Sequence, residues 1–131
     1  MWVLDTNTLI YFFKGEGQVA EALFDKRPAD IGIPAIVLYE LQAGIAKSSS
    51  PEQRMKQLAE LTSVVQVLPF AQPEARTAAD IRAALEKQGT PIGPCDTLIA
   101  GTALAHGAVL VSRNTREFAR IDDLRVEDWY Q

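Results

Sequence analysis

The sequence is poor in the two side chains that most often bind transition metals. It has one cysteine, Cys95, and one histidine, His106, among 131 residues. A zinc cluster of cysteine and histidine ligands is therefore excluded, as is any mechanism that needs two imidazoles. Carboxylates are the side chains left to carry metal or acid–base chemistry.

The chain also lacks a long apolar run and an excess of basic charge. No stretch has the length needed to span a bilayer, and Asp5 stands where a signal peptide would have its basic region. We therefore expect a cytoplasmic protein with no membrane contact. Because 13 Lys and Arg face 17 Asp and Glu, a formal net charge of −4, a nucleic-acid partner would need a local basic surface.

The remaining composition is that of a globular chain, with 47% hydrophobic and 23% charged residues. We expect one domain over residues 1–131. Helical periodicity is expected at 9–13, 18–24, 34–45, 51–61, 73–88, 96–105 and within 112–120. Short apolar strands are expected between these helices, at 2–4, 31–33, 64–68, 108–111 and 124–126. Strands that are apolar on both faces and alternate with helices predict an α/β fold, a parallel sheet covered by helices on both sides.

Two of the helices carry further local signals. The segment from Ser50 to Gln53, with Pro51 at the first helical position, predicts a capping box. The helix from Asp96 to Ala105 is built from small apolar residues and is expected to pack closely against the sheet.

Three acidic residues fall where an α/β sheet collects its working groups. Asp5 follows the first strand, Glu40 lies in the helix after the second, and Asp96 begins a late helix. Clustered carboxylates raise one another's pKa unless they share a cation, and oxygen ligands suit Mg²⁺. Each residue also has a structural interpretation: Asp5 as a helix cap, Asp96 as a first-turn acid, Glu40 as a surface residue.

Three arginines provide local basic charge near the end of the chain. Arg113, Arg116 and Arg120 are spaced by three and four residues, which would place them along one helical side, where they would contact phosphates of a nucleic-acid partner. The alternative is a solvated face, or pairing with Glu117. His106, next to Gly107, is expected to end a helix, and Cys95 has no histidine to activate it.

Four segments of the chain form a recognisable set: VLDTNTLI, the helix with LYELQAG, GTPIGPCDTLIAGTALAHG and LVSRNTREFARI. Together they resemble the PIN domain, and their order is similar to that of the VapC toxins of bacterial toxin–antitoxin pairs. The resemblance covers nearly the whole chain and implies a three-layer α/β/α fold with a central parallel sheet. It also implies that Asp5, Glu40 and Asp96 bind Mg²⁺ or Mn²⁺.

The same resemblance assigns supporting roles to three polar residues. Asn7 falls where the family has a small polar residue beside the first aspartate, and Ser112 lies two residues before Asn114. Many PIN domains have an aspartate where this chain has Asn114. Because an asparagine contributes no charge, we expect one resident cation rather than two tightly bound ones.

The resemblance implies a toxin with ribonuclease activity. A metal-activated water would cleave RNA, with tRNA and especially initiator tRNA as the first substrates to test, and would leave 5′-phosphate ends. A homodimer, inhibition by a VapB-type antitoxin, and contact with operator DNA only through that antitoxin are further expectations.

Two other interpretations stay open. Phosphatases of the haloacid dehalogenase type need a second aspartate where this chain has Asn7, and no lysine follows Lys87 to bind the phosphate, which also argues against a response-regulator receiver. A catalytically inactive PIN module that only binds a partner is the second alternative. Asn114 is the observation in its favour.

Overall fold

Five parallel strands form one central sheet in the computed structural model, which describes residues 1–131. Their order across the sheet is β3-β2-β1-β4-β5, and every neighbouring pair is parallel. The strands are β1 (Trp2–Leu4), β2 (Ile31–Pro34), β3 (Gln66–Leu68), β4 (Val109–Val111) and β5 (Val126–Glu127). The predicted α/β class is confirmed.

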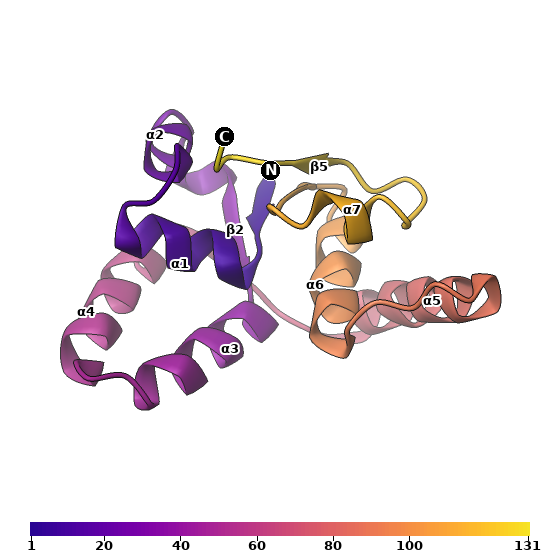
Figure 1. The fold of residues 1–131 in the computed structure, drawn as a ribbon, viewed down its shortest axis with the longest axis horizontal. Helices are drawn as coiled ribbons and strands as arrows, with labels where there is room; N and C mark the ends of the chain where they lie inside the picture. Colours follow the sequence, from indigo (N-terminus) through magenta and orange to yellow (C-terminus); the bar gives the residue numbers. More distant parts are fainter.

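Helices cover both faces of this sheet. Helices α1, α2 and α4 lie on one side of the strands, and α5 and α6 lie on the other (Figure 1). The bounds are α1 (Thr6–Lys14), α2 (Val19–Phe24), the 3-10 turn η1 (Pro28–Asp30), α3 (Ala35–Ala46), α4 (Pro51–Thr62), α5 (Gln72–Gln88), α6 (Pro94–Ala105) and α7 (Thr115–Phe118). None of these helices has the length and apolar character needed to cross a membrane. The three-layer arrangement is the one expected from the sequence.

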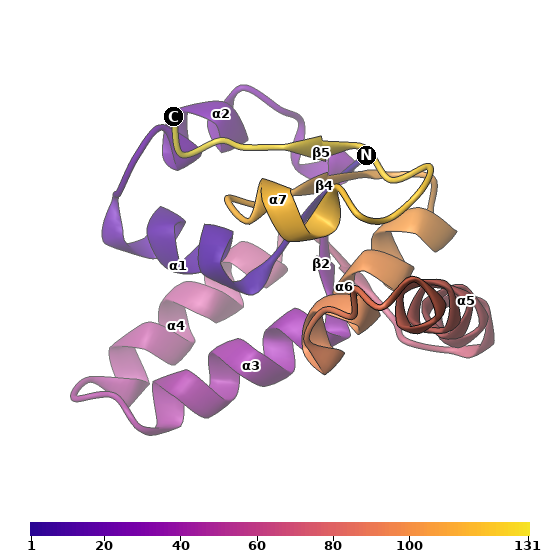
Figure 2. The same cartoon turned by 45° about the vertical axis from the view of Figure 1, so that its right-hand side comes forward.

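The chain path creates a switch point between β1 and β4. The chain starts in the middle of the sheet, builds outward to β3, and then crosses back through α5 and α6 to β4. β1 pairs with β4 along its whole length, and Figure 2 shows β4 beside its other neighbour, β5. The backbone N–H of Asp5 donates to the carbonyl of Val111 at 3.1 Å, so the ends of these two strands are joined. Open α/β sheets bind ligands at this place.

The small residues of α6 allow this helix to pack closely against α5. A Cβ on Gly101 would lie 2.6 Å from the Cβ of Ala78, closer than packed atoms tolerate. The helix contacts β2 and β4, as predicted, but its closest approach is to another helix. A glycine is needed there because the two backbones almost touch.

A polar contact between Glu74 and His106 joins the start of α5 to the end of α6. Glu74 is buried; its carboxylate accepts from the backbone N–H of Ala71 at 2.8 Å and lies 3.0 Å from Nε2 of His106. The hydrogen bond from the backbone N–H of Ala71 is the largest cause that holds the pKa of Glu74 below its usual range; burial opposes it, and the backbone N–H of Glu74 and then His106 lower the pKa further. His106 ends α6, as predicted.

The capping box expected at Ser50 is wrong. Ser50 precedes α4 and Pro51 opens it, but the serine side chain makes no capping hydrogen bond. Ser50 is exposed, so the N–H groups of the first turn are open to solvent and do not require a side-chain cap. A side chain reaches back to the start of its helix at Glu74 instead.

The expected strand at 64–68 is shorter and less buried than predicted. The backbone N–H groups of Val64 and Val65 both donate to the carbonyl of Leu61, which extends the end of α4 into a turn. Only Gln66–Leu68 pairs with β2, at the edge of the sheet, and Val67 is 43% exposed. The last strand likewise covers Val126–Glu127 rather than 124–126, because its pairing with β4 begins at Val126.

Candidate active site

Asp5 lies at the switch point and is almost fully buried, with 6% of its surface exposed. It precedes α1 as the N-cap residue, and its Oδ1 accepts from the backbone N–H of Thr8 at 2.9 Å. Burial raises the pKa of Asp5, the hydroxyl of Ser112 and the N–H of Thr8 lower it, and the charge of Glu40 adds a smaller increase. The capping interpretation of Asp5 is thus correct, and the same carboxylate lies within reach of other acids.

Asp96 is the third residue of α6 and is half-buried. Its side chain makes no hydrogen bond within the chain. Burial, followed by the charges of Asp5, Glu117 and Glu40, raises the pKa of Asp96 to about 6. Four carboxylates therefore act on one another at this edge of the sheet.

Glu40 reaches the same edge from α3, where its neighbours Val37 and Leu41 are buried. Its Oε1 accepts from the hydroxyl of Thr6 at 2.6 Å, which ties α3 to the start of α1. The thiol of Cys95 lies close to it; burial, followed by the charge of Glu40, raises the pKa of Cys95. This thiol stays protonated at neutral pH, as expected of a residue with no catalytic role.

The loop after β4 contributes Ser112 and Asn114. Ser112 is fully buried, and its Oγ accepts from the backbone N–H of Asn114 at 3.0 Å. The amide of Asn114 donates to Oε2 of Glu117 at 2.8 Å. Glu117, which sequence reasoning treated only as a partner for arginine, thus lies at the site and raises the pKa of Asp96. Its place three residues after Asn114 is the signal that could have identified it.

The residues that hold the acids in place at α1 are threonines rather than asparagine. Asn7 is exposed and makes no side-chain hydrogen bond. Thr6 bonds to Glu40, while Thr8 is buried and donates its hydroxyl to the carbonyl of Val111 at 3.2 Å. In the segment Asp-Thr-Asn-Thr, the threonines on either side of Asn7 therefore make the contacts within the chain, and Asn7 itself faces solvent.

The three arginines do not share one helical side, because α7 spans only Thr115–Phe118. Arg113 lies before that helix, with its guanidinium carbon 3.7 Å from the ring centre of Tyr130. Arg120 lies after the helix and donates to the carbonyl of Pro91 at 3.3 Å. Arg116 is exposed on the helix. The expected alignment is wrong, and the three side chains have different surroundings.

The chemistry of the donors fits a hard divalent cation, although the acids do not form a closed cage. No group of three or more His, Cys, Asp or Glu side chains is close enough to chelate an ion. Burial nevertheless raises the pKa values of Asp5 and Asp96, and the charges of neighbouring carboxylates raise them further, so a cation would favour the charged form of both acids. Mg²⁺ suits such an open set because it typically takes one or two carboxylates and keeps several waters.

The fold and the acids at the carboxyl ends of its strands define a class of α/β protein with an acidic site at the sheet's switch point. Comparison with known proteins identifies the family. The sequence model of the PIN domain matches residues 2–124. The tRNA(fMet)-specific endonuclease VapC of Shigella flexneri is 37% identical, over 98% of this chain and 97% of that relative.

Solved structures agree with the sequence matches. A VapBC2 complex from Rickettsia felis, bound to a DNA fragment from its promoter, contains a chain with a TM-score of 0.90 at 35% identity, covering 98% of each chain. A DNA-bound VapBC from Salmonella typhimurium has a TM-score of 0.90 at 38% identity, covering 98% of this chain and 97% of that one. This protein therefore belongs to the PIN-domain family, in its VapC branch.

Proposed function

We propose that this protein is the toxin of a toxin–antitoxin pair and acts as a metal-dependent endoribonuclease. The observation that carries the proposal is the convergence of Asp5, Glu40 and Asp96, from three separate elements, at the switch point of a PIN-type sheet. The names of its relatives, endonuclease and ribonuclease VapC, support the same activity.

Asp5, Glu40 and Asp96 are the residues that would hold a divalent cation, Mg²⁺ or Mn²⁺. When bound, the cation supplies positive charge for the phosphate oxygens and lowers the pKa of water. Thr8 fixes the carboxylate of Asp5, and Thr6 fixes that of Glu40, so two of the three acids are oriented before any ligand arrives. Glu117 adds negative charge beside Asp96 that the neutral Asn114 does not provide.

The proposed reaction is hydrolysis by water rather than attack by the substrate's own 2′-hydroxyl. The only histidine, His106, is paired with Glu74 at the far end of α5 and α6 and is not available as a base for RNA. Attack by water on phosphorus breaks the bond to the 3′-oxygen, which takes up a proton. The fragments would carry 5′-phosphate and 3′-hydroxyl ends.

Transfer RNA is the substrate class that we propose first. Two relatives that share 37% and 38% identity with nearly the whole chain are named for cleavage of tRNA(fMet). Initiator tRNA is therefore the leading single candidate.

A VapB-type antitoxin is the proposed inhibitor. A groove of about 290 Å³ contains Glu40 in its wall and is lined both by apolar residues such as Ile10 and Phe13 and by charged side chains such as Lys14 and Arg54. An amphipathic antitoxin segment in this groove would block access to Glu40. We expect the free toxin to be a homodimer and to reach operator DNA only through the antitoxin, in line with the DNA-bound VapBC complexes among its structural relatives.

Cleavage of purified tRNA tests the proposed activity. The protein and its Asp5→Asn variant are incubated with total tRNA in Mg²⁺, Mn²⁺ or EDTA, and fragment ends are mapped by sequencing. Discrete 5′-phosphate ends that vanish with EDTA and in the variant are the expected result. Equal patterns from the two folded, antitoxin-free proteins, on tRNA and on total RNA, would instead favour an inactive PIN module.

A further inference from the structure

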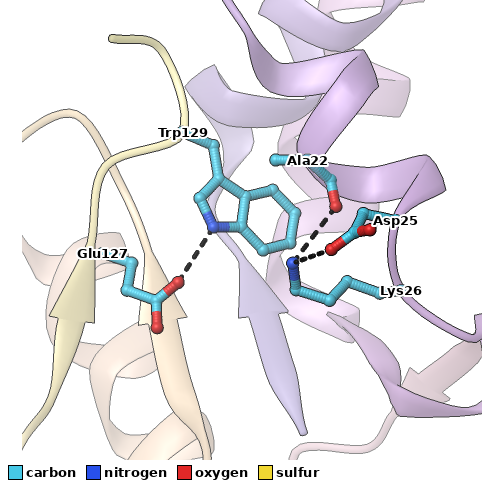
Figure 3. A network of polar contacts seen from close by, with 5 residues as sticks. All are labelled: Ala22, Asp25, Lys26, Glu127 and Trp129. Atoms are coloured by element: carbon cyan, nitrogen blue, oxygen red, sulfur yellow. Dashed lines mark hydrogen bonds and ion pairs between the residues drawn. The ribbon is translucent and has the colours of Figure 1, made fainter.

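The C-terminal tail is anchored to α2 through a lysine held between two tryptophans. The ammonium nitrogen of Lys26 lies 5.0 Å from the ring centre of Trp2 and 5.1 Å from that of Trp129. Figure 3 shows the same nitrogen bonded to the carbonyl of Ala22 and to Asp25, each at 3.4 Å. Trp129 is 7% exposed. Cation–π contacts and burial therefore fix the chain just before Tyr130.

Tyr130 is itself held against the turn between α1 and α2. Its carbonyl accepts from the backbone N–H of Gln18 at 3.0 Å. Gly17 has a positive φ of 62°, and a Cβ there would lie 2.6 Å from the carbonyl oxygen of Tyr130. The ring of Tyr130 meets that of Tyr11 edge to face, with the centres 4.9 Å apart. The position of Tyr130 is thus set by neighbours on three sides.

Arg113 lies on this pair of tyrosine rings. Its guanidinium carbon is 3.7 Å from the ring centre of Tyr130 and 5.7 Å from that of Tyr11. Arg113 is exposed and forms no salt bridge, whereas Arg27, Arg76 and Arg82 each pair with an acid. It stands between Ser112 and Asn114, in the loop that borders the acidic site.

This stacked arrangement suits the binding of a phosphate. Stacking uses the flat face of the guanidinium, so the in-plane N–H donors that do not reach the tyrosine hydroxyls stay available for phosphate oxygens. A long exposed arginine normally loses conformational entropy when it binds a ligand. Because the tyrosines already restrict the Arg113 side chain, less entropy is lost on binding. Because the chain has a net charge of −4, a fixed and unpaired cation in the loop that borders the acids is especially valuable for binding an RNA ligand.

We propose that Tyr130, together with Tyr11, is a positioning residue that holds Arg113 beside the acidic site, where Arg113 binds a phosphate of the RNA. This inference rests on the proposed ribonuclease function. It assigns a role to the C-terminal tail and separates Arg113 from Arg120, whose guanidinium already donates to the carbonyl of Pro91.

The test is steady-state cleavage of tRNA by variants of the full chain. We expect Tyr130→Ala to raise KM about three- to fivefold, with kcat within about twofold of the parent, because one cation–π contact is lost. Tyr130→Phe keeps the ring and should behave as the parent does. Arg113→Ala should raise KM about five- to tenfold and reduce the slope of log KM against log salt by about one.

Coupling between the two residues is the decisive readout. The double variant Arg113→Ala with Tyr130→Ala should be no worse than Arg113→Ala alone, because the tyrosine acts through the arginine. Arg113→Lys keeps the tail and the positive charge but removes the stacking on the tyrosine rings. It should therefore raise KM as much as is expected for Tyr130→Ala, and it provides the test if Tyr130→Ala folds poorly. Arg76→Ala removes an equal charge from the outer face of α5 and should leave KM unchanged.

Additive effects of the two alanine substitutions, or an unchanged KM in both Arg113→Lys and folded Tyr130→Ala, would overturn the positioning role. Cleavage by the parent but not by Asp5→Asn shows that the ribonuclease proposal still holds in that case. If the parent cleaves no RNA, the proposed function fails. Fluorescence titration of tRNA into the Asp5→Asn variant, and into the same variant that also carries Tyr130→Ala, then tests the phosphate site alone. Equal affinities for tRNA reject the phosphate site. Weaker binding by the variant that combines Asp5→Asn and Tyr130→Ala supports it.

Discussion

Two carboxylates that lie near opposite ends of α6, those of Glu74 and Asp96, have pKa values shifted in opposite directions. At one end, Glu74 accepts a hydrogen bond from Ala71 and lies against His106, and its pKa is lowered. At the other end, Asp96 has no hydrogen-bond partner, and burial, followed by the charges of three more acids, raises its pKa to about 6. The fold thus stabilises one negative charge and leaves the other unsatisfied.

The difference separates a structural acid from a functional one. Glu74 connects the start of α5 to the end of α6, and its charge is satisfied within the chain. Asp96 is held where its charge costs stability, a pattern typical of sites built for a ligand. The following predictions test this contrast, beginning with the largest expected effect.

Replacing the unsatisfied acid should abolish activity, whereas replacing the satisfied one should not. We expect Asp96→Asn to lower kcat for tRNA cleavage by at least about 100-fold, because a cation ligand is lost. Glu74→Gln should retain cleavage within about twofold at a temperature where it is folded, since it removes no group from the site. Comparable losses in both variants, measured on folded protein, would remove the distinction between the two acids.

The stability of the contact between α5 and α6 should depend on how closely the two helices pack at Gly101. Gly101→Ala places a Cβ against Ala78 and should cost about 1 to 3 kcal/mol of unfolding free energy, in spite of the better helix propensity of alanine. Gly44→Ala in α3 is the matched control, because no atom lies within 4 Å of the added Cβ. It should stabilise by about 0.5 to 1 kcal/mol in urea denaturation. A stabilised Gly101→Ala would show that the helices separate easily.

In the metal-free protein, removing Asp96 should increase stability even though it abolishes activity. A raised pKa means that the native state binds more protons than the unfolded state between about pH 4 and pH 6, so the stability from this group falls as pH rises through that window. At neutral pH in EDTA, Asp96→Asn should gain about 1 to 2 kcal/mol, a value reduced for partial exposure. The gain should vanish below about pH 4. A loss of stability at neutral pH would contradict the account of Asp96.

Glu74 should show the reverse dependence on pH. Because its folded pKa is lowered, its contribution is present above the ordinary glutamate pKa and disappears as pH falls through the folded value. Glu74→Gln should therefore lower Tm by a few degrees at neutral pH and by less in acid. Thermal unfolding followed by circular dichroism at several pH values measures this. A deficit that stays constant with pH would mean that shape, not charge, matters at this position.

The sequence was informative about the elements and about the acids. Alternating strands and helices, the glycine or histidine at helix ends, and the motif residues Asp5, Glu40 and Asp96 are local features, so they can be identified along the chain. The boundaries that were wrong lie at the edges of the sheet. There, β3 and β5 extend only as far as their single neighbour pairs with them, and hydropathy does not report pairing.

Contacts between distant segments account for what the sequence did not reveal. Glu117 reaches Asp96 because the loop after β4 lies beside the start of α6, and Tyr130 reaches Arg113 because the tail is fixed against α1 and α2. The sequence by itself determined the fold class and which acids are present. Only the tertiary structure decided which of those charges are satisfied, because the pKa of a carboxylate depends on burial and on neighbours brought together from far along the chain.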